Sequence, residues 1–146
     1  MVAGYGGGRL DSLLMRGNDV LLSFPQLVIA HGYDNNWVLN GSGYRQVSTA
    51  VDPNTRIALR TFTDQPGVQF YSGNFLVGDL IGTSGDAYRQ GAGFTLETQH
   101  YPDAPNHIGQ KNWPSVVVGP GKTFTSRTAF AFSVDGHSLK GTNPFK

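Results

Sequence analysis

The chain has 146 residues, a formal net charge of +1 and no cysteine. This length is enough for one domain with its own core. The near-zero charge gives no reason to expect nucleic acid as a partner, and the missing cysteines exclude disulfide bonds and thiolate catalysis. We expect a cytoplasmic protein, because cysteine-free chains fit a reducing compartment and the longest apolar stretch, Val20–Ala30, is too short to span a bilayer.

Glycine and turn residues dominate the composition. The chain holds 20 glycines, and only 14% of its residues are charged, which is typical of a β-rich protein with many turns. Residues 1–30 carry no legible pattern, and residues 135–146 read as a loose tail. We therefore expect an all-β, antiparallel structure over residues 31–134.

Short alternating segments bounded by turn residues predict the strands in chain order. Asp52, Pro53 and Asn54 supply a hairpin turn, and a long glycine-rich loop is expected over Phe75–Gly91. The predicted strands are Trp37–Asn40, Tyr44–Val51, Arg56–Thr63, Val68–Asn74, Phe94–Tyr101, Ser115–Val118 and Lys122–Val134.

Two of these strands place hydrogen-bonding side chains opposite an apolar face. Alternate residues of a strand share a face, so Gln69 and Tyr71 point one way, as do Glu97 and its neighbours Thr95 and Gln99. Glu97 is the only glutamate of the chain. Amides, a carboxylate and a phenol suit a polyhydroxyl ligand. An ordinary antiparallel sheet with one wet face explains the same pattern.

Asp34 stands at the mouth of the predicted strand Trp37–Asn40. An Asx-turn is the common role for an aspartate before two asparagines. His100, Asp103 and His107 are spaced across a Pro-rich loop that matches no metal-binding pattern. We therefore expect no metal site there, and loop hydrogen bonds instead.

Four segments resemble a known family: GYDNNWVLN, DQPGVQFYSGNFL, GAGFTLETQHYPDAPNH and PSVVVGPGKTF. In order and spacing they are similar to the C-terminal half of the aldose 1-epimerases, or galactose mutarotases. The resemblance covers roughly His31–Val134. It implies a truncated part of a large antiparallel β-sandwich whose concave sheet face holds a sugar.

The resemblance also implies roles for individual residues. Glu97 falls on the general base of the family, Asp34 on a residue that binds sugar hydroxyls, and Gln69 on a substrate contact. The implied reaction interconverts the α and β anomers of a free hexose such as galactose or glucose, by acid–base ring opening. It requires no metal or cofactor.

The acid of the family is a histidine from the N-terminal half, and no residue of this chain matches its motif. Two alternatives therefore stay open, a non-catalytic carbohydrate-binding module and an inactive mutarotase fragment. A hexose-phosphate epimerase needs clustered basic residues, and Arg45, Arg60 and Arg89 are dispersed in the sequence. Missing strands also predict self-association or pairing with an N-terminal half.

Overall fold

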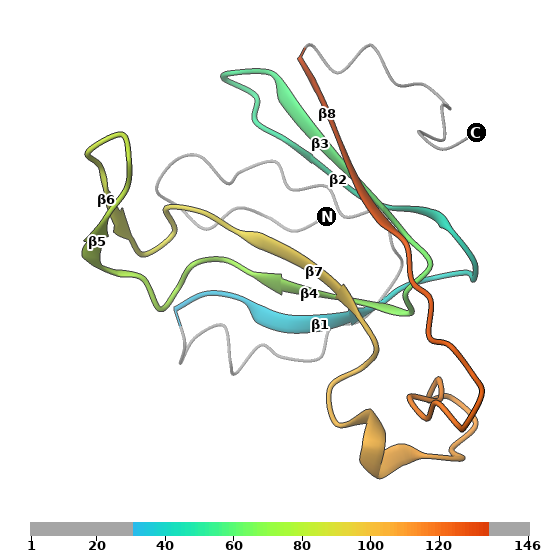
Figure 1. Cartoon of the computed structure of the whole chain (residues 1–146). Coiled ribbons are helices and arrows are strands. Elements are labelled where there is room, and N and C mark those ends of the chain that lie inside the picture. Colours follow the sequence, from blue (N-terminus) through green and yellow to red (C-terminus); the bar gives the residue numbers. More distant parts are fainter. Residues whose placement is uncertain (1–30, 135–146) are drawn as a thin grey trace. The chain divides into compact units, whose positions relative to one another are not determined.

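The computed structural model describes residues 31–134 (Figure 1). In this range all strand pairs are antiparallel, which confirms the all-β class. The elements are β1 (Asp34–Val38), β2 (Arg45–Val51), β3 (Ile57–Thr63), β4 (Gly67–Tyr71), β5 (Val77–Ile81), β6 (Ala87–Arg89), β7 (Thr95–Gln99), the 3-10 helix η1 (Ala104–His107) and β8 (Thr128–Val134). No helix within this range is long and apolar enough to cross a membrane.

The expectations for residues 1–30 and 135–146 lie outside the described residues, so the proposed division into three segments stays a prediction. The described part of the chain forms two compact units, residues 39–65 with 122–134, and residues 31–38 with 66–121. Each unit is described by itself.

The first unit holds a three-stranded sheet in the order β2-β3-β8. The predicted turn between β2 and β3 is confirmed: Asp52 Oδ1 accepts the Asn54 backbone N–H at 3.0 Å, and Asp52 Oδ2 accepts the Thr55 hydroxyl at 2.7 Å. An aspartate at this position mimics a backbone turn. Its two carboxylate oxygens therefore fix the hairpin.

Asp64 joins the end of β3 to the segment before β8. Its carboxylate accepts the Arg127 backbone N–H at 3.1 Å and the Ser126 hydroxyl at 3.1 Å. Partial burial acts to raise the Asp64 pKa, but the hydrogen bonds from Arg127 and Ser126 outweigh it, so the pKa lies below the usual 3.8.

The second unit holds a three-stranded sheet in the order β1-β4-β7, with the hairpin β5–β6 and η1. Val68, at the centre of β4, is fully buried, and Phe70 and Leu96 are 6% and 7% exposed. Phe70 also contacts the rings of Tyr33 and Phe94, with centroids 5.5 and 6.1 Å apart. These residues form the core on one face of this sheet.

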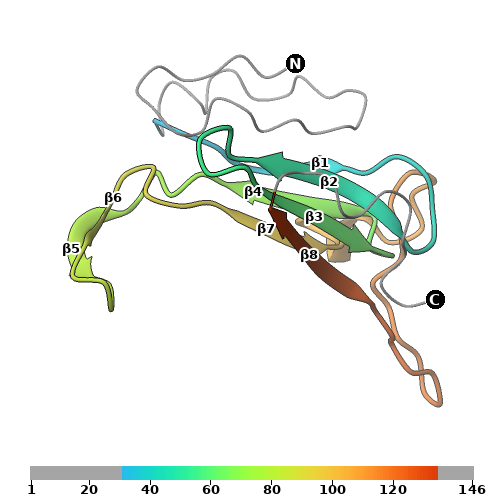
Figure 2. The same ribbon diagram turned by 90° about the horizontal axis from the view of Figure 1, so that it is seen from above.

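The prediction of a loop over residues 75–91 was wrong. The expected loop Phe75–Gly91 contains the hairpin β5–β6, which leaves the end of β4 and returns to β7 (Figures 1 and 2). Its apolar side chains are largely exposed, and its register is irregular between Val77 and Ile81. No buried face therefore imposed an alternating pattern on this segment of the sequence.

The C-terminal strands also differ from expectation. The segment Ser115–Val118 is not a strand, and the Ser115 hydroxyl accepts the Val117 N–H at 3.2 Å. This local bond offers the backbone an alternative to sheet pairing. The last strand begins at Thr128 instead of Lys122, and Phe130, Phe132 and Val134 share its more exposed face, at 50%, 68% and 64% exposure.

Asp64→Asn removes a carboxylate whose folded-state pKa is depressed. Such a group stabilises the folded state at pH values above 3.8, the ordinary pKa of aspartate. This stabilisation is lost as the pH falls through the lower pKa of the folded state. We expect the variant to unfold at a lower temperature than the wild type near neutral pH, and the difference to shrink below about pH 4. Thermal unfolding followed by circular dichroism across this range measures it. Asp79→Asn is the matched control, because the Asp79 carboxylate is exposed on β5. A difference that stays constant with pH would contradict the assignment.

Gly67→Ala tests how closely side chains approach the start of β4. A Cβ at Gly67 would lie 2.8 Å from Asn36 Oδ1 and 3.2 Å from the ring of Tyr101. We expect a loss of about 1–3 kcal/mol in the free energy of unfolding, as in other overpacked sites, measured by urea denaturation. Gly93→Ala is the control, because its Cβ meets no atom within 4 Å. Equal stability of the two variants would argue against this packing.

Candidate functional site

The register of β1, β4 and β7 lines up the candidate residues across the sheet. Asn36 lies opposite Gln69, and Gln69 lies opposite Glu97. The adjacent row on the same face consists of Asp34, Tyr71 and Thr95. Val68, Phe70 and Leu96 point to the opposite face, because alternate residues point in opposite directions. The predicted division into a polar and an apolar face is therefore confirmed.

Asp34 and Gln69 contact each other directly. Gln69 Nε2 donates a hydrogen bond to Asp34 Oδ1 at 2.7 Å. Asp34 is the first residue of β1, and its carboxylate reaches across to β4, so the structure shows a cross-strand contact where an Asx-turn was the alternative. Within the described residues, Asp34 Oδ2 makes no hydrogen bond, so this oxygen is available to a ligand hydroxyl.

Gln69 has an amide oxygen whose environment differs from that of its nitrogen. Its Oε1 atom is buried and has no hydrogen-bond partner in the described part of the chain. A buried acceptor without a donor costs about 1–3 kcal/mol. The hydrogen bond from the Gln69 amide nitrogen to Asp34 is therefore the polar contact that this side chain makes across residues 31–134.

Glu97 projects from the middle of β7 and is exposed. The Thr95 hydroxyl donates to Glu97 Oε1 at 2.8 Å. No hydrogen bond within the described residues reaches Oε2. One carboxylate oxygen is therefore hydrogen-bonded within its own strand, and the other is available to a ligand.

Asn36 and Gln99 were not singled out as site residues from the sequence. Gln99 Nε2 donates to Asn36 Oδ1 at 3.4 Å, and Asn36 occupies the same row as Gln69 and Glu97. The sequence did contain a sign of this, because Asp34 and Asn36 are alternate residues and share a face if the segment is a strand. The run Asp-Asn-Asn is typical of a turn, however, and was interpreted as one. Only the position of β1 shows that these residues share a face.

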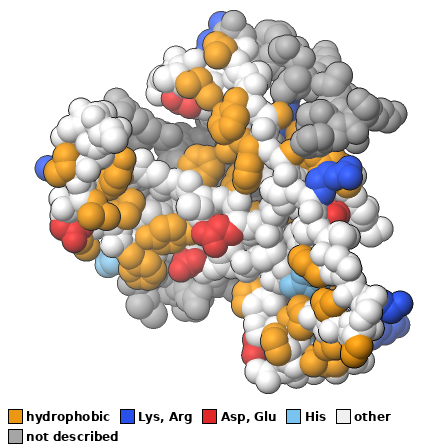
Figure 3. All heavy atoms as spheres, in the orientation of Figure 1, with side chains coloured by type: hydrophobic (Ala, Val, Ile, Leu, Met, Phe, Trp, Pro, Cys, Tyr) orange, Lys and Arg blue, Asp and Glu red, His pale blue; other side chains and the backbone are white. Residues whose placement is uncertain are grey.

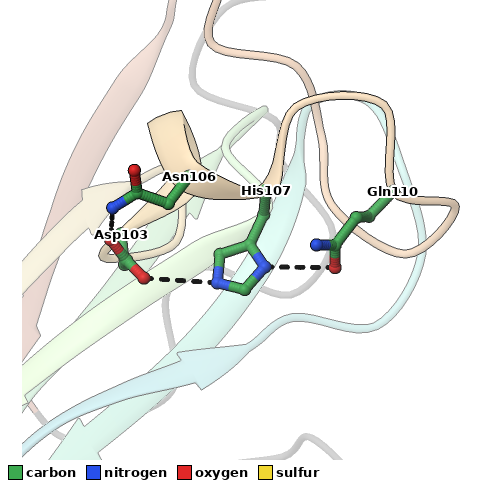
Figure 4. A network of polar contacts seen from close by, with 4 residues as sticks. All are labelled: Asp103, Asn106, His107 and Gln110. Atoms are coloured by element: carbon green, nitrogen blue, oxygen red, sulfur yellow. Dashed lines mark hydrogen bonds and ion pairs between the residues drawn. The ribbon is translucent and has the colours of Figure 1, made fainter.

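An aromatic cluster borders this face where β4 begins. Tyr101 contacts Trp113 edge-on at 5.5 Å, and Trp113 stacks on His107 at 3.7 Å between ring centroids. His107 Nε2 lies 3.2 Å from Asp103 Oδ2, and its Nδ1 lies 3.1 Å from Gln110 Oε1 (Figure 4). The expected loop hydrogen bonds of Asp103 and His107 are present.

A second aromatic pair borders the face where β4 ends. Phe75 stacks on Tyr71 with ring centroids 6.1 Å apart. Tyr71 lies directly opposite Asp34 in the register. Acidic and hydrophobic side chains also lie next to one another on the surface seen in Figure 3.

The arrangement combines two carboxylates, two amides and flanking aromatic rings. Carboxylates carry two oxygen atoms that act as hydrogen-bond acceptors. Such groups accept hydrogen bonds from hydroxyls, and amides both donate and accept. Across residues 31–134, no group of three or more His, Asp and Glu side chains is arranged to hold a metal ion. The carboxylates and amides of this face are groups that can hydrogen-bond to the hydroxyls of a ligand.

Comparison of the sequence with known proteins identifies the family of this chain. A sequence model described as aldose 1-epimerase matches residues 7–131. The match therefore begins at residue 7, whereas the resemblance recognised in the sequence begins at His31. It covers all three strands of the candidate face.

Individual relatives agree. The chain is 44% identical over 106 residues to galactose mutarotase of Rattus norvegicus and 43% identical over 106 residues to that of Homo sapiens. It is 32% identical over 105 residues to aldose 1-epimerase of Escherichia coli. These alignments cover 71%, 71% and 69% of this chain, and 30%, 30% and 29% of the relatives. The chain thus spans about a third of the length of the proteins it matches, and it belongs to the aldose 1-epimerase family.

Proposed function

We propose that this chain carries the proton-accepting part of a site that interconverts the anomers of a free hexose, such as galactose or glucose. The observation that carries the proposal is the cross-strand row in which Glu97 faces Gln69, which in turn holds Asp34. A base and two hydroxyl-binding groups stand on one sheet face of a chain that belongs to the aldose 1-epimerase family.

Glu97 is the proposed general base. Its Oε2 atom accepts the proton of the C1 hydroxyl, while the Thr95 hydroxyl holds Oε1 at 2.8 Å and fixes the plane of the carboxylate. The oxygen of C1 then forms a carbonyl. A base must lie within hydrogen-bond reach of the proton it takes, and exposure of Glu97 leaves it accessible to a sugar.

Ring opening completes the first half of the reaction. The bond between C1 and the ring oxygen breaks, its electron pair stays on the ring oxygen, and that oxygen takes a proton from an acid. The aldehyde rotates about the C1–C2 bond, and the ring closes by the reverse steps with Glu97 returning its proton. We assign no acid among the described residues, and propose that a partner polypeptide, either an N-terminal half or a second copy, supplies it.

Asp34 and Gln69 are the proposed substrate-binding residues. Asp34 Oδ1 is fixed by the Gln69 amide, so Oδ2 accepts a sugar hydroxyl without losing that contact. Hydrogen bonds to a charged group are worth about 1.5–3 kcal/mol. These two residues therefore hold the sugar while the chemistry takes place at C1.

A second function is sugar binding without catalysis. It is favoured by one observation, that Asp34, Gln69 and Glu97 can bind hydroxyls on one sheet face while no acid is assigned among the described residues. Binding requires only Asp34, Gln69 and their neighbours, whereas catalysis requires an acid as well. Proton transfer by a positioned group typically contributes about 10²–10⁴-fold, so a site without an acid is expected to be slow.

Glu97→Gln tests the base. The variant keeps a side chain of similar shape that cannot accept the proton, so we expect catalysed mutarotation to fall by about 10²–10⁴-fold. Polarimetry on freshly dissolved α-galactose, with the purified chain, measures the rate. Asp79→Asn, an exposed carboxylate on β5, is the matched control and is expected to keep the wild-type rate.

The same measurement separates the two functions. If the wild type accelerates mutarotation and Glu97→Gln does so equally, Glu97 is not the base. If the wild type gives no acceleration but binds galactose in a titration, the chain binds sugar without catalysis. Addition of the N-terminal part of a galactose mutarotase then tests whether a partner restores the rate.

A further inference from the structure

Phe75 is an exposed aromatic residue held in a fixed position at the border of the polar face. It is 63% exposed, and its ring stacks on Tyr71 with an interplanar angle of 18°. Offset stacking at a centroid distance of 6.1 Å uses one side of the Phe75 ring. The other side is open to a ligand.

Two sets of hydrogen bonds fix Phe75. Its backbone N–H donates to Tyr71 Oη at 3.0 Å. The preceding turn has a left-handed glycine, Gly73, whose carbonyl accepts the N–H groups of Leu76 and Gly91 at 3.2 Å each. A Cβ at Gly73 would lie 2.7 Å from the Gly93 carbonyl oxygen, so the turn is pressed against the segment before β7. Phe75 is therefore preorganised although its ring is exposed.

The ring lies beside groups that bind hydroxyls. Tyr71 is the direct cross-strand neighbour of Asp34 on one side and of Thr95 on the other. The Cβ atoms of such neighbours are about 5 Å apart. The Tyr71–Phe75 pair thus extends the row of polar residues with an apolar surface on the same border of the sheet.

We infer that Phe75 is a specificity-determining residue that stacks on the apolar face of the bound sugar, with Tyr71 as its positioning residue. This inference rests on the proposed function of Asp34, Gln69 and Glu97. The axial hydroxyl at C4 of galactose leaves the hydrogens of C3, C4 and C5 together on one face, whereas in glucose they are divided between both faces. A flat aromatic ring therefore favours galactose, while Asp34 binds hydroxyls at the ring edge.

Phe75→Ala is the central test. We titrate isotopically labelled protein with galactose and with glucose, each at anomeric equilibrium, and follow the backbone amide resonances of Asp34, Gln69 and Glu97. The variant is expected to bind galactose about three- to tenfold more weakly, the range of an aromatic contact. Glucose binding is expected to change less, so the selectivity for galactose falls. Phe75→Tyr is expected to restore it.

A matched control and a positioning variant sharpen the test. Phe132→Ala removes an aromatic ring of similar exposure, 68%, on β8 and is expected to leave both affinities unchanged. Tyr71→Phe keeps the stacked ring but removes the oxygen that accepts the Phe75 N–H. It is expected to shift the Phe75 amide resonance and to reduce selectivity in part.

The outcomes distinguish this inference from the function on which it rests. Unchanged affinities for both sugars in Phe75→Ala, with the site resonances still shifting, overturn the role of Phe75 and leave the sugar site standing. Equal weakening for both sugars overturns its role in specificity. If the wild-type resonances respond to neither sugar, the proposed site itself is wrong, and the inference falls with it.

Discussion

In-register antiparallel pairing of β1, β4 and β7 is the constraint on which the candidate site depends. Because side chains alternate along each strand, burial of Val68, Phe70 and Leu96 determines where Gln69 and Glu97 point. A slip of one residue in any pair would reverse both faces. The core therefore sets the direction of the polar side chains, and Asp34, Gln69 and Glu97 all lie on strands of one sheet.

Much of this unit could be predicted from the sequence, and the reason lies in the buried face. The strands around Gln69 and Glu97 alternate between core and solvent, so their pattern is legible, and their ends were displaced by only a few residues. The hairpin β5–β6 was not predicted, because Val77, Leu80 and Ile81 are exposed at 60–79% and follow no alternation. Alternation of apolar and polar residues arises where one face of a strand is buried, and the apolar side chains of this hairpin are exposed.

The candidate site shows a similar division. The alternation of side chains along each strand predicted that Gln69 and Glu97 lie on polar faces, and the family resemblance pointed to Asp34. Neither argument could predict which strand pairs with which. Hence Asn36 was read as part of a turn, and the contact between Asp34 and Gln69 was not foreseen. Tyr101, Trp113 and His107 meet through an irregular loop, where the chain has no period from which contacts follow.

The hydrogen bond between Thr95 and Glu97 has a consequence for the proposed binding of a sugar: C1 and the remote hydroxyls cannot be held equally firmly. In the proposed reaction, Glu97 Oε1 is held by Thr95, so a proton taken from one anomer returns from Oε2 to the other anomer. The hydroxyl at C1 changes ring face between the two anomers, so both must bring it to one point in space. Such a site needs room around C1 and firm contact at the remote hydroxyls, which Asp34 and Gln69, joined by a hydrogen bond, are proposed to bind. In the proposed reaction, C1 therefore changes position between the two anomers, while the hydroxyls at the opposite edge of the sugar stay in place.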